Sequence, residues 1–294
     1  MGLKNVELKN NETPRLMAVL AHPDDESFGM GGTLAKYARM GVDVYLVCAT
    51  RGEVGEMDEQ FLRGYDSPAA RREAELRCAA EKLGIKEVLF LDYRDSGMTG
   101  SPHNIHPQSL FSAPLSEVAE KVAHLIRKYR PQVLITFDPI GGYRHPDHIK
   151  IHEATISAYS LASSLEDYQD PENLTDYKPA KLYYHTIPRA FLRFTVKLLK
   201  FVGKDPQKFG KNKDIDLLSI TEVDFPVDAV INYREVAELK SNANACHASQ
   251  GGSKLGGGIM GWLRVFFGSK DLFMRAVPTP SNAEKKEADL FSGI

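Results

Sequence analysis

The sequence has no long hydrophobic run. None of its uninterrupted apolar stretches approaches the roughly 20 residues that a membrane-spanning helix needs, so we expect no integral membrane segment. The N-terminus is polar and lacks the apolar core of a secretory signal peptide. The net charge of −2 favours neither nucleic acid nor an anionic surface as a partner. These absences predict a cytoplasmic protein that binds no nucleic acid.

Cysteine is also scarce. The three cysteines, Cys48, Cys78 and Cys246, form no C-x-x-C pair and are spread along the chain. An odd count at such spacing argues against a disulfide framework. Cys48 lies in an apolar run and Cys78 in a helical pattern, so both are predicted to be small core residues.

Apolar runs alternate with helical patterns over the first 160 residues. The expected strands are Leu16–Ala21, Val42–Ala49, Val88–Leu91 and Val133–Phe137. The expected helices are Ser27–Met40, Ala69–Leu83, Leu115–Tyr129 and one that begins near Pro146. This alternation is typical of βαβ units and predicts an α/β fold, with a Rossmann-like parallel sheet flanked by helices on both faces.

The alternation is lost after residue 161. We expect a core formed by residues 14–160 and a C-terminal α/β extension, residues 161–294, that packs on the core, covers the site and completes its pocket. The elements expected in the extension are a loop at Ser163–Ala180, a strand at Leu182–Thr186 and a helix at Tyr233–Ala248.

Two further segments of the extension are distinctive in composition. The basic stretch Arg189–Lys213, which includes Phe191–Lys213, predicts an amphipathic helix. Docking on its own domain is favoured over contact with a membrane surface, because no second anchoring signal accompanies it. The glycine-rich segment Gly251–Gly261 predicts a loop that could cover a substrate.

Two short acidic and histidine-rich segments each follow an expected strand. His22-Pro-Asp-Asp-Glu26 comes directly after the first strand, and His145-Pro-Asp-His148 follows the fourth strand by a short loop. Ligands of open parallel sheets bind beyond the carboxyl ends of the strands. If the two strands are neighbours, the segments face one crevice, where His145 and His148 share one face of a helix's first turn.

A dinucleotide-binding loop is the nearest rival for this position. Gly29-Met30-Gly31 offers G-x-G, but Leu34 stands where the third glycine is expected. The carboxylates of Asp24, Asp25 and Glu26 would repel a pyrophosphate at a helix N-terminus, whereas they suit a divalent cation.

Imidazole and carboxylate ligands without cysteine are typical of catalytic zinc, which takes about three protein ligands and keeps one position open. We assign His22, Asp25 and His148 as metal ligands. Fe²⁺ suits the same ligands. Asp24 adjoins a ligand and is predicted to be the base that takes a proton from water.

The remaining polar residues of the two segments receive supporting roles. His145 is predicted to stabilise an oxyanion and then to protonate a departing amine. Asp147 is expected to orient a histidine from behind or to cap the helix, and Glu26 to be structural.

These segments, with others between and after them, resemble the LmbE-like (PIG-L-like) zinc N-deacetylases. The residues that carry the resemblance are Ala21–Glu26 (A-H-P-D-D-E), Thr50–Gly55 (T-R-G-E-V-G), Arg72–Leu76 (R-E-A-E-L), Arg94–Met98 (R-D-S-G-M), Gly141–His148 (G-G-Y-R-H-P-D-H) and His247–Gln250 (H-A-S-Q). The order and length of these motifs make the resemblance specific over residues 15–160 and again near 230–250.

The resemblance implies a zinc enzyme that removes the acetyl group from an N-acetylglucosaminyl conjugate, as in the branch that acts in low-molecular-weight thiol biosynthesis. It implies the ligand, base and acid roles given above, and a carbonyl-polarising role for Tyr143. Arg72, Asp95 and His247 are implied to bind substrate. The expected partner is thus a small amino-sugar substrate, and a homo-oligomer is left open.

Three alternatives stay open at this point. An amidase that cleaves a larger sugar–thiol conjugate would use the same chemistry and differ only in its product. A carbohydrate-binding protein could keep the metal without turnover, although binding alone needs neither Asp24 nor His145. A nucleotide-binding oxidoreductase would bind NAD, which the acidic segment disfavours.

Overall fold

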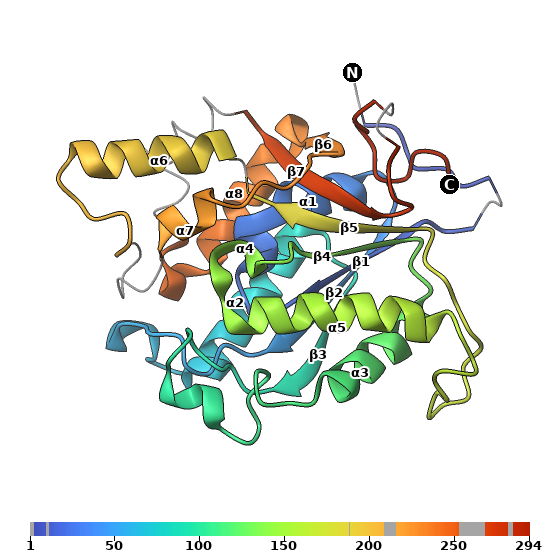
Figure 1. Ribbon diagram of the computed structural model, residues 1–294, viewed down its shortest axis with the longest axis horizontal. Coiled ribbons are helices and arrows are strands. Elements are labelled where there is room, and N and C mark those ends of the chain that lie inside the picture. Colours follow the sequence, from blue (N-terminus) through green and yellow to red (C-terminus); the bar gives the residue numbers. More distant parts are fainter. Residues whose placement is uncertain (1–2, 10–11, 188, 209–215, 253–267, 282–284) are drawn as a thin grey trace.

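A seven-stranded sheet forms the centre of the computed structural model (Figure 1). The structure describes residues 3–9, 12–187, 189–208, 216–252, 268–281 and 285–294. The strands are β1 (Arg15–Leu20), β2 (Asp43–Thr50), β3 (Glu87–Tyr93), β4 (Val133–Phe137), β5 (Lys181–Thr186), β6 (Ala229–Asn232) and β7 (Lys270–Val277). Their order across the sheet is β3-β2-β1-β4-β5-β7-β6.

Helices cover both faces of this sheet (Figure 1). They are α1 (Gly31–Arg39), α2 (Pro68–Leu83), α3 (Leu115–Tyr129), α4 (Gly141–Arg144), α5 (Pro146–Ala162), α6 (Arg189–Phe201), α7 (Leu217–Thr221) and α8 (Ala237–Cys246). Helices α1, α2 and α8 contact one another in one layer, and α3 packs against α5 in the other. No helix among these described residues has both the length and the apolar character needed to cross a bilayer.

The α/β fold is confirmed, but the sheet is not parallel throughout. Strands β1 to β5 pair in parallel, as expected, whereas β7 runs antiparallel to both β5 and β6. Strand β7 was not predicted. Most of its residues alternate between buried and half-buried positions, the pattern of a strand covered on one face. Its sequence therefore lacks the continuous apolar run that marks a fully covered strand.

The C-terminal part of the chain thus extends the same sheet through β5, β7 and β6. The boundary at residue 160 falls inside α5, and the completion of a substrate pocket by residues 161–294 stays a prediction. Of the predicted glycine-rich segment, residues 253–261 lie outside the described part of the chain.

Local sequence signals explain why the helices begin and end where they do. In α2 the Ser67 hydroxyl accepts a hydrogen bond from the Ala70 amide at 3.1 Å, and Pro68 occupies the first turn. The helix ends at Gly84, whose φ of 74° lies in the left-handed region that favours glycine. The predicted helix Ala69–Leu83 begins one residue later than α2 and ends at the same residue.

The expectation about cysteine was wrong in part. Cys78 of α2 and Cys246 of α8 form a disulfide across 168 residues of sequence, because the two helices lie side by side in one layer. Neither spacing nor count reveals a pair brought together by tertiary packing. Cys48 is free and buried in the core, as predicted.

Helices α6 and α7 pack against each other outside the two main layers (Figure 1). Their contact is a separate small apolar cluster with four buried members, Leu192, Val196, Leu217 and Ile220. The predicted helix at Arg189–Lys213 is therefore observed as α6 up to Phe201, and residues 209–213 lie outside the described residues.

Candidate metal centre and active site

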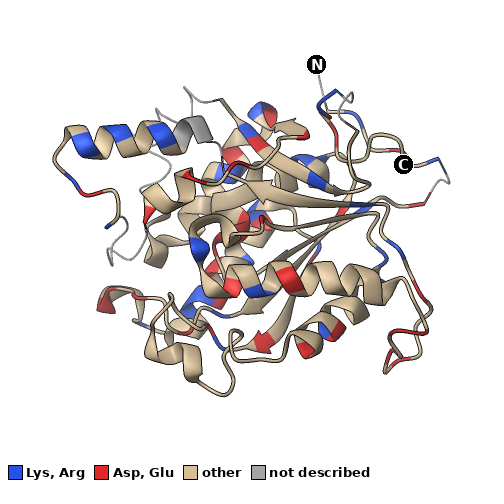
Figure 2. Ribbon diagram, in the orientation of Figure 1, with Lys and Arg blue, Asp and Glu red and all other residues tan. Residues whose placement is uncertain are grey.

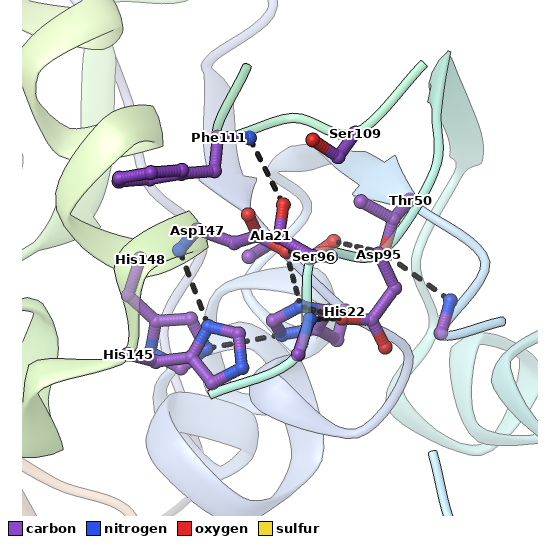
Figure 3. Close-up of polar contacts among 12 residues, drawn as sticks. Ala21, His22, Thr50, Asp95, Ser96, Ser109, Phe111, His145, Asp147 and His148 are labelled. Atoms are coloured by element: carbon purple, nitrogen blue, oxygen red, sulfur yellow. Dashed lines mark hydrogen bonds and ion pairs between the residues drawn. The ribbon is translucent and has the colours of Figure 1, made fainter. Parts of the chain in front are cut away.

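The two acidic and histidine-rich segments meet because their strands are neighbours. Strand β1 pairs with β4 in parallel, so their carboxyl ends open at the same edge of the sheet. His22 follows β1 by one residue, and His145 to His148 enter through α4 and the first turn of α5. Figure 3 shows His22, His145 and His148 facing one another from these two loops.

Three side chains converge on one point. His22 Nδ1 lies 3.1 Å from His148 Nε2, which in turn lies 3.3 Å from Asp25 Oδ1. Asp25 Oδ2 is 3.6 Å from His22 Nδ1. Tetrahedral zinc with bonds of about 2.0–2.1 Å separates its ligand atoms by about 3.4 Å, so the two imidazole nitrogens and the Asp25 carboxylate have the spacing of a metal-ligand set.

In each imidazole, the ring nitrogen that points away from the other two ligands faces a hydrogen-bond acceptor. His22 Nε2 lies 3.1 Å from Asp147 Oδ2, and His148 Nδ1 lies 3.2 Å from the Gly141 carbonyl oxygen. A neutral histidine that donates from its outer nitrogen points a lone pair inward from the other one. With both rings neutral, two lone pairs 3.1 Å apart would lie beside a carboxylate, the donor set that a cation binds in place of a proton.

The surrounding charge also favours a cation. Asp25, Asp95 and Asp147 contact His22, and among the described residues Arg72 forms ion pairs with Asp95 and with the neighbouring Asp24. Burial lowers the pKa of His22, but the nearby carboxylates, Asp95 first, raise it well above its ordinary value. The donor chemistry and the charge therefore both fit a divalent metal.

His145 lies beside this set but faces it differently. Its Nδ1 accepts a hydrogen bond from the Asp147 amide at 3.2 Å and caps α5, so in the neutral ring the proton is on Nε2. Burial and the neighbouring His22 and His148 lower the pKa of His145 well below its ordinary value. The side chain therefore presents a neutral Nε2–H donor.

Asp24 is held in an unusual backbone conformation. Its φ of 115° is rare for any residue other than glycine, and its amide donates to Glu26 Oε2 at 3.0 Å. Its Oδ2 accepts a hydrogen bond from Arg72 Nη2 at 3.2 Å. Burial raises the pKa of Asp24 to about 6, although the Arg72 guanidinium opposes the rise.

Arg72 and Asp95 are both brought to the centre. Arg72 is buried and also donates to the carbonyl oxygens of Gly52 at 3.1 Å and Pro23 at 2.7 Å. Asp95 Oδ1 lies 3.4 Å from His22 Nε2. The Arg72 guanidinium therefore holds the loop that carries Asp24 through its hydrogen bonds to Pro23 and Asp24.

His247 lies behind the first loop rather than in front of it. It is fully buried, and its Nε2 is 2.7 Å from Glu26 Oε1. Because the other carboxylate oxygen of Glu26 accepts from the Asp24 amide, the histidine reaches Asp24 through Glu26. This contact joins the end of α8 to the loop that carries Asp24 across 221 residues, and the sequence contains no signal of it.

Tyr143 stands at the rim of the same group. Its ring centroid lies 4.9 Å from that of His148 and 5.9 Å from that of His145. Two glycines with positive φ, Gly141 and Gly142, turn the chain just before it. Burial raises the pKa of Tyr143 well above its ordinary value, and the negative charge of Asp25 adds to the rise. The hydroxyl therefore keeps its proton and can donate a hydrogen bond.

Comparison with known proteins agrees with this arrangement. The profile of the PIG-L family, described as GlcNAc-PI de-N-acetylase, matches residues 17–159. A 1D-myo-inositol 2-acetamido-2-deoxy-alpha-D-glucopyranoside deacetylase 2 from Catenulispora acidiphila is 38% identical over 250 residues, 82% of this chain and 81% of the relative. The chain belongs to the PIG-L family. A deacetylase of the same name, without the number, from Thermomonospora curvata is 35% identical and covers 95% of this chain and 97% of its own.

Solved structures with the PIG-L-like fold include proteins of more than one activity. An N,N'-diacetylchitobiose deacetylase from Pyrococcus horikoshii has a TM-score of 0.64 at 23% identity, over 94% of this chain and 91% of its own. A 4-carboxy-2-hydroxymuconate hydratase from Pseudomonas putida has a TM-score of 0.59 at 19% identity, over 93% of this chain and 100% of its own. At such identities the likeness shows the fold alone, and the reaction has to be argued from the site.

One residue that shapes this PIG-L site was missed from the sequence. Asp138 follows β4 directly, and its Oδ1 accepts hydrogen bonds from the amides of Gly142 at 2.8 Å and Ile140 at 3.1 Å. It therefore folds the turn that carries Tyr143. An aspartate followed by proline and two glycines is a turn signal that could have identified it.

Proposed function

We propose that this PIG-L family protein is a zinc-dependent N-deacetylase acting on an N-acetylglucosaminyl conjugate. The observation that carries the proposal is the convergence of His22, Asp25 and His148 at metal-ligand spacing, with Asp24 and His145 beside them. The names of the relatives support the substrate class, since they are deacetylases of a 2-acetamido-2-deoxy-glucopyranoside of inositol.

His22, Asp25 and His148 would hold the ion. Bound zinc supplies Lewis acidity and lowers the pKa of water from about 15.7 to about 7. Fe²⁺ suits the same donors and is the second candidate. Asp147 and the Gly141 carbonyl fix the two imidazoles from behind, so little reorganisation is needed when the ion binds.

Asp24 takes the proton of the attacking water. Its carboxylate lies next to the ligand Asp25, and the Arg72 guanidinium orients it from the other side. A pKa near 6 leaves it ionised at neutral pH yet basic enough to accept a proton, the condition for an effective general base.

His145 and Tyr143 act on the other side of the amide. The water oxygen attacks the acetamide carbon, and the Nε2–H of His145 and the hydroxyl of Tyr143 donate hydrogen bonds to the oxyanion that develops. The C–N bond then breaks as the nitrogen takes the proton that Asp24 removed from water. His145 is neutral with its proton on Nε2, so it stays a hydrogen-bond donor to the oxyanion in place of the predicted acid. The products are acetate and the free amino sugar, and Asp24 is left ionised for the next turnover.

In this proposal Arg72 and Asp95 orient hydroxyl groups of the sugar. One carboxylate oxygen of Asp95 contacts His22 Nε2, and the other lies 3.9 Å from Arg72 Nη1. Asp95 and Arg72 together form one charged wall of the metal centre. The buried His247 acts behind that wall, through Glu26.

Metal reconstitution with product analysis tests the proposal. Chelated, metal-free protein is incubated with the inositol glycoside of N-acetylglucosamine, with and without one equivalent of Zn²⁺ or Fe²⁺, and released acetate and free amine are both quantified. We expect equal amounts of acetate and amine only after metal addition. Undiminished turnover by metal-free protein, or release of a larger acid in place of acetate, would contradict the proposal.

A further inference from the structure

Helix α6 and the residue that follows it carry apolar side chains on two opposite faces. On the inner face Leu192 and Val196 are buried against α7. On the outer face Leu198, Phe201 and Val202 are 38%, 89% and 54% exposed, and Phe194 is 40% exposed. Isolated exposed apolar residues are ordinary, but four of them along one short helix form a patch.

The spacing places these four residues in one stripe. Positions 194, 198, 201 and 202 are separated by four, three and one residues, which on a helix of 3.6 residues per turn is a single face. The inner positions 192, 196 and 199 repeat in the same way, turned by about half a circle. The outer stripe therefore lies on the side of α6 opposite α7.

A basic stripe lies between the two apolar faces. Arg193, Lys197 and Lys200 are exposed and recur at helical spacing, and the exposed Lys204 follows the end of the helix. The sequence from 189 to 204 contains five basic residues and no acidic residue. Figure 2 shows α6 with blue bands and no red, unlike α3 or α5, where both signs occur.

The inner face of α6 packs within the protein, as the sequence favoured, and that packing leaves the outer apolar stripe exposed. We propose that this second face docks the protein on the surface of an anionic lipid bilayer. The outer stripe enters the boundary between headgroups and acyl chains, and the basic stripe contacts the anionic headgroups. The helix has 13 residues, too few to span the bilayer, and lies in the plane of the interface. The proposal concerns where the protein binds and does not depend on the reaction proposed above.

The charge pattern selects this occupant over a second copy of the chain. In a two-fold contact the same patch meets itself, which would bring the basic stripes of both copies together. An anionic surface neutralises that stripe instead. The inner face of α6 also belongs to a cluster that includes Ile140 and Tyr143, so docking would hold the rim of the active site next to the bilayer.

Vesicle binding of the full-length protein tests the proposal. Partition is measured by co-sedimentation with phosphatidylcholine vesicles that contain either about 30% phosphatidylserine or none. We expect binding to the anionic vesicles that weakens as salt is raised, and little binding to the neutral ones. Because each basic side chain near such a surface contributes about fivefold, the triple variant Lys197→Gln, Lys200→Gln, Lys204→Gln should partition about 100-fold less.

Matched variants separate this surface from general charge and from loss of folding. The triple variant Lys82→Gln, Lys86→Gln, Lys128→Gln changes the net charge equally on exposed positions of other parts of the chain and should bind as the parent does. Phe201→Ala should weaken binding about tenfold. All three variants should keep the deacetylase activity on a water-soluble substrate measured without vesicles.

Three results would overturn the proposal: no partition onto anionic vesicles, equal losses in both triple variants, or a concentration-dependent dimer that Phe201→Ala abolishes.

Discussion

The end of the sheet and the α6–α7 flank are built in opposite ways. At the end of the sheet, charged side chains are buried and hydrogen-bonded to one another, and the large apolar core that includes β1 and β4 lies beneath them. In the flank, four buried apolar residues support a helix whose outer face is exposed. Local stability follows the number of buried contacts, so the first region is preorganised and the second can adapt to what it touches.

The largest effect is expected in the preorganised region, from Asp24→Asn. The amide cannot take the proton of the attacking water, so turnover of the zinc-loaded protein should fall about 10³-fold. The metal content, measured by elemental analysis, should remain equal to that of the parent because the proposed ligands are untouched. Near-normal turnover by the correctly loaded variant would place the base elsewhere.

A pair of core truncations compares the two regions directly. Leu76 on α2 is fully buried in the main core, so Leu76→Ala should lower the free energy of unfolding by about 3 kcal/mol. Leu192→Ala removes the same atoms from the small cluster under α6 and should cost about 1 kcal/mol or less, because that cluster can open without unfolding the sheet.

Denaturant unfolding followed by circular dichroism measures both changes. Hydrogen exchange on α6 supplies the control for the flank, since Leu192→Ala should accelerate exchange there and leave β1 and β4 unchanged. Equal losses of global stability in the two variants would show that the flank and the sheet unfold as one unit.

A smaller effect is expected behind the metal ligands, from Asp147→Asn. Asp147 is fully buried and contacts His22 Nε2 at 3.1 Å, so the shape-conserving change weakens the partner that orients this ligand. Zinc affinity, measured by competition with a chelating dye, should fall about 10- to 100-fold. Exposed Asp92 provides the matched control, since Asp92→Asn should leave the affinity unchanged.

Much of the site could be predicted because its residues are close in sequence to the ends of strands. An apolar run followed by His22 to Glu26 places those side chains at the edge of a parallel sheet, and the same reasoning applies to His145 to His148. The remaining step, that β1 and β4 are neighbours, is the one that the structure supplies.

Contacts between distant parts of the chain could not be predicted in this way. The bond between His247 and Glu26 and the disulfide between Cys78 and Cys246 both depend on α8 returning to lie beside α1 and α2. Hydrophobic periodicity reports which face of an element is covered and is silent about which element covers it. The antiparallel strand β7 was not predicted because it is covered on one face only, so its sequence lacks a continuous apolar run.

The backbone angle of Asp24 has a consequence for the stability of the folded chain. A φ of 115° suits glycine, and holding an aspartate there costs about 1–3 kcal/mol. Asp24→Gly and Asp24→Ala both delete the carboxylate and differ only in the methyl group, so the glycine variant should melt at the higher temperature. The residue proposed as the general base thus occupies a backbone position where glycine would give a more stable folded chain.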